Sequence, residues 1–525
     1  MGIPSYFRHI LTRYPGLLQG IKDDFKSDIL LVDFNCLIYG CVHSPSMPPY
    51  RESERAEWES RLLEEIKTYV VKIWSAAGKP AHVRLCVDGV VPMAKIKQQR
   101  LRRFKSVWLA AKEREYGVRA VGQESWDTNS ITPGTEFMEK LSVSLKGLCA
   151  ARAGWVVSGA EEFGEGEQKL MEWVRSKGDS IGKKHITVYG LDADLIVLCL
   201  LHAGTVAKEA EWTIVREAQE FGGRGGKPTH EFLGLNCQGL LKILFPSEGT
   251  RAAELRDYVC GMSLLGNDFL PHSLGINIRE GGHDRLNHVL AQLHGDGKYL
   301  VDASGCIIPG TLAQILEGFA ETEEADIAAA FDKKYSMRAQ PPRSESERAM
   351  LPVQNLPLEW AEEGRLWSKK QLTADWKVRY YGDTLIQQDV HQRCMAYFQG
   401  LQWVLDYYTG RQPVSTEWMY AWTYPPLWSD LRLAIQGMDV MLLPSADVKE
   451  AALEPQQQLS MVLPYESWGL IRSRALKMLP TVAPAFWPKS FDFESLGKRW
   501  LWECYPCIPI LVPARLRSLL TSEEK

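Results

Sequence analysis

The N-terminal half of the chain alternates short apolar runs with segments of helical periodicity. The runs are rich in β-branched and aromatic side chains and lie at 29–33, 82–87, 155–158, 186–189 and 212–215. Such runs are typical of parallel strands that are buried on both faces. Helical patterns lie between them, at 55–77, 135–150 and 167–177. This alternation predicts an α/β fold with a mainly parallel central sheet flanked by helices.

Acidic residues follow several of the predicted strands. Ligands bind at the carboxyl ends of the strands in an open parallel sheet, so we expect carboxylates at these ends to converge. Converging carboxylates repel one another, whereas two Mg²⁺ or Mn²⁺ ions would hold them as oxygen ligands and activate water against a phosphodiester. The candidate catalytic residues and metal ligands are Asp33, Asp88, Glu165, Glu167, Asp192, Asp194 and Asp268. Helix capping is the alternative interpretation, and it stays open for Glu165.

A basic helical stripe begins a few residues after Asp88. Its members stand at positions i, i+4, i+7 and i+8 and therefore share one face of a helix. Arginine offers paired planar donors and lysine a point charge, which together suit a terminal phosphate. A solvated surface is the alternative, but the closeness to Asp88 favours a phosphate pocket. The stripe consists of Lys95, Gln99, Arg102 and Arg103.

The overall charge does not indicate a nucleic-acid-binding protein. The net charge is −4 and the pI about 6.3, so any such site must be a local basic patch. The 11 cysteines are odd in number and irregularly spaced, which favours reduced thiols in an intracellular compartment. The sequence shows neither a signal-peptide pattern nor an apolar stretch of about 18 residues. We therefore expect a soluble intracellular protein that does not bind membranes, in the cytoplasm rather than the nucleus.

Composition divides the chain into three parts. Residues 1–320 hold the predicted sheet and the acidic set, and 376–525 form a second, aromatic-rich region. Between them, 321–375 is charged, contains prolines and has weak periodicity, which predicts a linker or a mobile excursion.

The glycine-rich stretch 222–229 lacks the spacing of a phosphate-binding loop, because Pro228 follows its lysine. We predict a flexible surface loop there.

Long motifs throughout the chain resemble the Xrn family of 5′→3′ exoribonucleases. In the N-terminal part they are MGIPSYFR, LVDFN, VDGVVPMAKIKQQRLRRF, ITPGTEFM, SGAEEFGEGEQKLM, YGLDADLIVL and GNDFLPHSLGINIREGGHDRL. In the C-terminal part, the family's second shared region is similar to WKVRYYG, GLQWVLDYYTG, QQQLSMVLP and FDFESLGKRWLWE. The resemblance covers most of the chain apart from 321–375.

The resemblance implies a nuclease core related to the flap endonucleases in 1–320. It implies a second region in 376–525 that packs on this core and completes an RNA channel. The seven acids would bind Mg²⁺, with Mn²⁺ as a substitute, and the basic stripe would hold the 5′-phosphate. The implied activity, in mRNA decay, is hydrolysis of single-stranded RNA with a 5′-monophosphate to nucleoside 5′-monophosphates. We expect the protein to act as a monomer.

Two aromatic positions depart from the family pattern. Tyr39 stands where the family usually has a histidine that stacks on the terminal base, and its ring predicts that stacking is retained. A core position for Tyr39 is the alternative. Trp418, in an altered aromatic segment, is the candidate for the other side of that base. Two other functions remain open for the chain, namely a catalytically silent RNA-binding scaffold and a structure-specific DNA flap nuclease.

Overall fold

The strands of the N-terminal part form one seven-stranded sheet. In chain order they are β1 (Leu18–Gly20), β2 (Ile29–Asp33), β3 (His82–Cys86), β4 (Trp155–Ser158), β5 (His185–Tyr189), β6 (Glu211–Glu217) and β7 (Phe232–Asn236). Their order in the sheet is β1-β7-β6-β5-β2-β3-β4. The five strands from β6 to β4 pair in parallel, whereas β7 and β1 extend one edge antiparallel. The predicted α/β fold with a mainly parallel sheet is confirmed, and only the antiparallel edge was not expected.

The structure, a computed structural model, describes residues 2–119, 124–218, 231–337, 341–342, 344–382, 387–440 and 453–522. The predicted surface loop at 222–229 lies outside these residues. The helices up to residue 295 are α1 (Tyr6–Arg13), α2 (Asn35–Val42), α3 (Arg55–Ala76), α4 (Met93–Glu115), α5 (Glu136–Ala150), α6 (Gly166–Lys177), α7 (Asp194–Thr205), α8 (Cys237–Leu244), α9 (Arg251–Leu264) and α10 (Gly282–Gly295).

The remaining elements belong to the C-terminal part of the chain. Its helices are α11 (Pro309–Ala320), α12 (Glu323–Ser336), α13 (Glu345–Trp360), α14 (Trp376–Tyr381), α15 (Gln387–Thr409), α16 (Trp428–Ala434), α17 (Pro455–Val462), α18 (Arg474–Lys477), α19 (Leu479–Val482) and α20 (Pro513–Ser522). Two short hairpins pair β8 (Trp367–Ser368) with β9 (Gln371–Leu372), and β10 (Phe493–Glu494) with β11 (Tyr505–Pro506). Among the described helices, none combines the length and apolarity that a membrane span requires.

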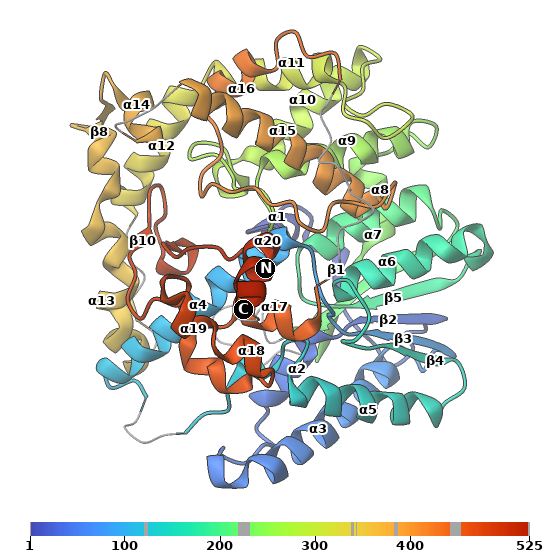
Figure 1. Ribbon diagram of the computed structural model, residues 1–525. Helices are drawn as coiled ribbons and strands as arrows, with labels where there is room; N and C mark the ends of the chain where they lie inside the picture. Colours follow the sequence, from blue (N-terminus) through green and yellow to red (C-terminus); the bar gives the residue numbers. More distant parts are fainter. Residues whose placement is uncertain are drawn as a thin grey trace.

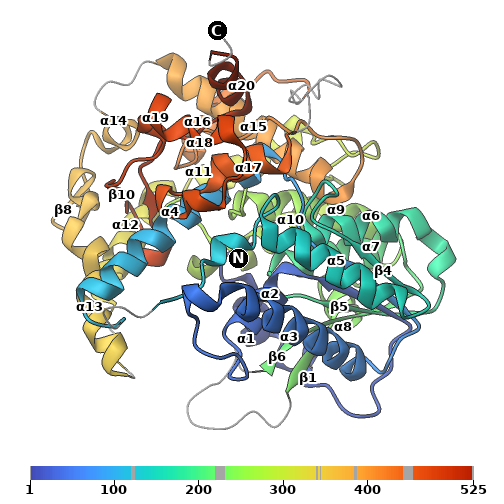
Figure 2. The same ribbon diagram turned by 60° about the horizontal axis from the view of Figure 1, so that its bottom comes forward.

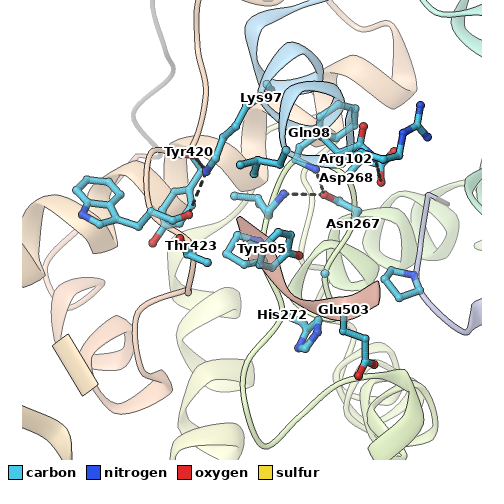
Figure 3. A pocket seen from close by; sticks show the side chains of 18 of the residues that line it. Lys97, Gln98, Arg102, Asn267, Asp268, His272, Tyr420, Thr423, Glu503 and Tyr505 are labelled. Atoms are coloured by element: carbon cyan, nitrogen blue, oxygen red, sulfur yellow. Dashed lines mark hydrogen bonds between the residues drawn. The ribbon is translucent and has the colours of Figure 1, made fainter. Parts of the chain in front are cut away.

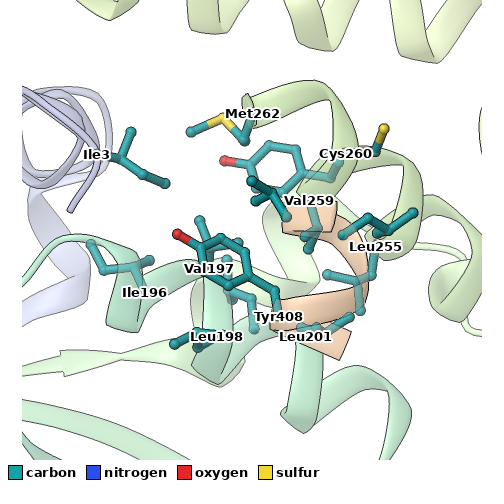
Figure 4. Close-up of a cluster of buried hydrophobic side chains, with 14 of the residues drawn as sticks. Ile3, Ile196, Val197, Leu198, Leu201, Leu255, Val259, Cys260, Met262 and Tyr408 are labelled. Carbon is teal, nitrogen blue, oxygen red and sulfur yellow. The ribbon is translucent and has the colours of Figure 1, made fainter. Parts of the chain in front are cut away.

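Helices cover both faces of the sheet, because successive side chains of a strand point to opposite faces. Leu30 and Val32 of β2 pack with α3 and α5, whereas Ile29 and Leu31 pack with α6 and α7. Figure 1 shows these helix pairs on opposite sides of the sheet. On the face that α6 and α7 cover, the buried residues of α7 and α9 meet the end of α15 (Figure 4). The C-terminal part thus shares one apolar core with the sheet.

Helix α4 connects the sheet to the last part of the chain. It starts beyond the end of β3 and runs outward beside α17, α18 and α19 (Figure 2). Its buried residues, such as Ile96 and Phe104, pack against Leu459 and Leu511. The fully buried guanidinium group of Arg100 donates hydrogen bonds to three carbonyl oxygens, those of Met461, Phe486 and Pro509. One arginine therefore holds three separate C-terminal segments on α4.

The stretch 321–375, for which the composition predicts a linker or a mobile excursion, contains the helices α12 and α13. Ile327 and Phe331 of α12 are buried in an apolar cluster, and α13 continues through two internal prolines. The buried Lys334 donates a 2.7 Å hydrogen bond to the buried Glu363. Glu363 also accepts a hydrogen bond of 2.6 Å from the backbone of Gly497. Many of the charges in this stretch, together with Pro352 and Pro357, belong to helices that bury apolar side chains.

Candidate active site

The acidic residues meet at the carboxyl ends of the parallel strands. Asp33 ends β2, Asp88 follows β3 by two residues, and Asp194 begins α7 directly beyond β5. Carboxylate oxygens of Asp33, Asp88 and Glu167 lie within 4.8 Å of one another. Asp33, Glu165, Glu167 and Asp194 are buried, and the rest are half-buried. We call the seven candidate residues the acid site.

Burial and mutual repulsion shift the ionisation of several of these carboxylates. Burial, together with the charges of Asp88, Asp192 and Asp194, raises the pKa of Asp33 well above its usual value. Burial and the charge of Asp192 raise the pKa of Asp194 to about 7. Burial and the charge of Glu165 raise the pKa of Glu167. A hard dication would stabilise the ionised forms of Asp33, Glu167 and Asp194, which burial and repulsion disfavour.

Two residues outside the predicted set hold Asp88 in place. The Asn35 side chain donates a hydrogen bond of 2.9 Å to Asp88, whose backbone N–H donates one of 3.1 Å in return. The backbone N–H of Gly166, in the first turn of α6, donates to the other Asp88 oxygen at 2.7 Å. A Cβ at Gly166 would lie 2.6 Å from an Asp33 oxygen, so only glycine fits there. Asn35 lies in the motif LVDFN and Gly166 in GEGE, and only the acids of these motifs were predicted to belong to the site.

Lys95 bonds to the acid site rather than standing free in a phosphate pocket. Its ammonium group donates to Glu165 and, at 2.8 Å, to Asp268. Burial disfavours the charged ammonium group, but Asp268 and Glu165 hold the pKa of Lys95 well above its usual range. Lys95 therefore joins the basic stripe of α4 to two of the seven acids.

The other members of the stripe have different surroundings. Gln99 is buried, and its side-chain oxygen has no hydrogen-bond partner among the described residues. Arg103 is buried as well and donates to Thr132 and, at 3.0 Å, to Asn129. Burial lowers the pKa of Arg103 to about 10. Arg102 is only half-buried and is therefore more accessible to solvent than Arg103.

Arg102 lines a cavity that opens next to Asp268. The cavity lies between α4, the loop that follows α9 and two C-terminal segments (Figure 3). Gln98 points into it and donates a long hydrogen bond of 3.4 Å to Asp268. On the far side, Lys97 donates to the carbonyl oxygens of Tyr420 and Trp422 at 2.7 and 3.2 Å. A basic and aromatic cavity thus continues from the acid site along α4.

An aromatic stack connects α15 to the acid site. The Tyr407 hydroxyl donates a hydrogen bond of 2.7 Å to Glu165. The ring of Tyr407 stacks on Trp403, with centroids 5.0 Å apart, and Trp403 stacks on Trp418 at 5.1 Å. One face of Trp418 is therefore covered by protein. Tyr407 stands in the motif GLQWVLDYYTG but was not among the predicted site residues.

Tyr39 lies on the opposite side of the sheet from Trp418. It is half-buried on α2 and packs at the margin of the cluster that contains α3 and α5. Its hydroxyl is close enough to Arg103 to affect the ionisation of that guanidinium group. Tyr39 and Trp418 pack against different apolar clusters. The structure thus places Tyr39 next to the basic stripe and Trp418 next to α15.

Two family models match the chain on either side of its middle. The model for the XRN 5'-3' exonuclease N-terminus matches 1–218, and that for the Xrn1 helical domain matches 359–524. The chain belongs to the Xrn family of 5′→3′ exoribonucleases. In this Xrn chain, the contact between Glu165 and Tyr407 joins the two matched regions at the acid site.

Similar Xrn proteins come from animals and fungi. The 5'-3' exoribonuclease 2 of Gallus gallus is 25% identical over 99% of this chain and 70% of its own length. The 5'-3' exoribonuclease 1 of Homo sapiens is 28% identical over 98% of this chain and 34% of its own length. The 5'-3' exoribonuclease 1 of Schizosaccharomyces pombe is 26% identical, and the chain spans 49% of it. The chain therefore covers a third to a half of the latter two relatives.

Proposed function

We propose that the protein is a 5′→3′ exoribonuclease that degrades single-stranded RNA with a 5′-monophosphate by two-metal-ion hydrolysis. The observation that carries the proposal is the convergence of buried carboxylates at the ends of β2, β3 and β5. Membership of the Xrn family supports the same activity.

The acid site fits Mg²⁺, with Mn²⁺ as a substitute. Its donors are carboxylate oxygens, which hard dications prefer, and burial with repulsion from neighbouring acids makes Asp33 and Asp194 unstable as free anions. We assign as metal ligands Asp33, Asp88, Glu165, Glu167, Asp192, Asp194 and Asp268. Bound dications would supply an activated water and stabilise the leaving oxygen. Asn35 and Gly166 orient the Asp88 carboxylate, and Tyr407 orients Glu165.

The basic stripe explains why cleavage would start from an end. Arg102, Arg103 and Gln99 lie on α4 beside Lys95, which itself contacts Glu165 and Asp268. A 5′-phosphate held by this stripe would therefore lie next to the acids. The distance between the bound phosphate and the acids would then set cleavage to the first nucleotide. A 5′-hydroxyl offers the guanidinium groups no charged partner.

The experiment compares three substrates under two metal conditions. The full chain is incubated with 5′-monophosphate RNA, 5′-hydroxyl RNA or flap DNA, in Mg²⁺ or in EDTA. We expect nucleoside 5′-monophosphates from the first substrate only, and no products in EDTA. Asp88→Asn should bind RNA but not cleave it, because it removes a metal ligand and keeps the side-chain shape. Binding without cleavage by the unmodified protein would indicate a scaffold, and preference for flap DNA would indicate a flap nuclease.

A further inference from the structure

A second group of potential metal ligands lies outside the acid site. His9 is on α1, and His283 and Asp284 are in the first turn of α10. One ligand atom of each of the three residues lies within 4.8 Å of the others. The His9 Nε2 atom is 3.8 Å from an Asp284 oxygen, and the two imidazole centroids are 4.6 Å apart. Three residues from two helices therefore point at one small volume.

The His9 ring has a nitrogen that the protein does not satisfy. Its Nε2 atom is buried and has no hydrogen-bond partner among the described residues, although it faces Asp284. Buried polar atoms in folded proteins are nearly always hydrogen-bonded, so an exception requires an explanation. A cation between His9 and Asp284 would supply the missing contact for both side chains.

The His283 ring is held in the way that ligating histidines are held. Its Nε2 atom forms a hydrogen bond of 2.7 Å with the Tyr258 hydroxyl, which bonds in turn to the Tyr6 hydroxyl at 2.5 Å. A hydrogen bond on one ring nitrogen fixes the tautomer and directs the other nitrogen to a metal. The other nitrogen, Nδ1, has a long contact of 3.4 Å with the Asn287 amide, which a metal ion would displace. His283 is fully buried, so these contacts fix the ring before any ligand arrives.

We propose that His9, His283 and Asp284 bind one transition-metal dication of the Zn²⁺ class, with water as a further ligand. Two imidazoles and one carboxylate suit such an ion, whereas Mg²⁺ prefers a shell of oxygens. Asp284 is 56% exposed, which gives the ion and its water a path from solvent. The exposed Arg13, one turn beyond His9, is the neighbouring charge that opposes binding, and solvent screens it.

The proposed ion would clamp the N-terminal segment in place. Helix α1 follows Gly2, and a Cβ at Gly2 would lie 2.6 Å from the carboxyl carbon of Asp194. Ser5, just before α1, accepts a hydrogen bond of 2.8 Å from Arg279, close to the start of α10. A metal bridge between α1 and α10 would strengthen this attachment and keep Gly2 against the acid site.

The test measures Zn²⁺ binding to the full chain in excess Mg²⁺, which occupies the oxygen ligands of the acid site. Metal analysis after gel filtration and the Tm with and without Zn²⁺ are the two readouts. The variants are His9→Gln and Asp284→Asn, both at partly exposed positions. His288→Gln, at an exposed position of the same helix α10, is the matched control.

We expect the unmodified protein and His288→Gln to retain one equivalent of Zn²⁺ and to gain thermal stability from it. His9→Gln and Asp284→Asn should lose both effects while their circular dichroism spectra remain native. With Co²⁺ in place of Zn²⁺, the visible absorption of a nitrogen-ligated ion should appear only in the unmodified protein and in His288→Gln. Equal Zn²⁺ retention in all four proteins, or none in the unmodified protein, would overturn the proposal.

Discussion

The Tyr407 hydroxyl donates a hydrogen bond of 2.7 Å to Glu165, which lies 242 positions earlier in the sequence. Glu165 also accepts from Lys95, so its two oxygens are held by different parts of the chain. The orientation of one acid therefore depends on α15, which carries no candidate metal ligand. This contact makes the C-terminal part a component of the acid site rather than a cover over it.

Removing this hydroxyl should weaken metal binding more than it weakens the fold. Tyr407→Phe keeps the ring stacked on Trp403, so we expect a Tm close to that of the unmodified protein. Loss of a hydrogen bond to a ligand typically costs about 10- to 100-fold in metal affinity or activity. The measurement is the Mg²⁺ dependence of RNA hydrolysis. Tyr408→Phe is the control, because the buried Tyr408 hydroxyl has no hydrogen-bond partner in the described part of the chain. An equal shift of the Mg²⁺ dependence in Tyr407→Phe and Tyr408→Phe would contradict the role of Tyr407.

The metal-free acid site should destabilise the protein as the pH rises. Burial and Asp192 raise the pKa of Asp194 from 3.8 to about 7. Between pH 3.8 and about 7, the folded protein holds a proton on Asp194 that the unfolded chain releases. The stabilisation that this proton gives the folded state is therefore lost as the pH rises through about 7. In EDTA, Asp194→Asn should therefore raise the Tm more at about pH 8 than at about pH 5. Thermal melts of both proteins at both pH values check this, since titrating groups remote from the acid site cancel in the comparison. A gain in Tm that is larger at about pH 5 than at about pH 8 would disprove the raised pKa of Asp194.

Arg102 should determine much of the preference for a 5′-monophosphate. A hydrogen bond to a charged group contributes about 1.5–3 kcal/mol, so Arg102→Ala should reduce the rate ratio between 5′-monophosphate and 5′-hydroxyl RNA by about 10- to 100-fold. Arg114→Ala removes the same charge from the exposed end of α4 and should leave the ratio unchanged. If both variants lower the ratio equally, general attraction of RNA explains the effect and no phosphate pocket is needed.

Substitution of Tyr39 should separate base stacking from core packing. Its half-buried ring beside Arg103 can present one face to a base, and stacking contributes about 1–3 kcal/mol per base. We expect Tyr39→Phe to be nearly silent and Tyr39→Ala to raise KM for single-stranded RNA. Both kcat/KM and Tm are measured for each variant. A large fall in Tm with an unchanged rate per folded molecule would identify a purely structural residue.

Glu363 should be important for stability although it lies far from the acid site. Its carboxylate is fully buried and bonds to Lys334 and to the backbone of Gly497. Removing one member of a buried ion pair typically costs about 3–5 kcal/mol, so Glu363→Ala should unfold at a clearly lower denaturant concentration. The exposed Glu324, on α12, provides the control, and Glu324→Ala should change stability by less than about 0.5 kcal/mol. A silent Glu363→Ala would mean that 321–375 is only loosely attached.

Local sequence patterns predicted the strands that carry the acids but not the contacts that arrange them. Apolar runs are decisive for β2 and β5, which are buried on both faces, whereas the short edge strand β1 has no such pattern. Helical spacing placed Lys95 on the same stripe as Arg102. It could not show that Lys95 would bond to Glu165 and Asp268, since those partners come from other elements. The same limit applies to 321–375, whose charges are visible in the sequence while its burial depends on distant segments.

The three carbonyl acceptors of Arg100 also bear on the order in which the protein can be completed during synthesis. A ribosome adds about 5–20 residues per second, so the strands emerge long before Pro509. Until then, a guanidinium group that is fully buried in the finished protein lacks part of its hydrogen-bonding shell, and burying it would be costly. Helix α4, which carries the basic stripe, therefore reaches its final packing only after residue 509 has left the ribosome. A nascent chain that ends between residues 268 and 509 contains every acid of the site and is not yet a finished nuclease.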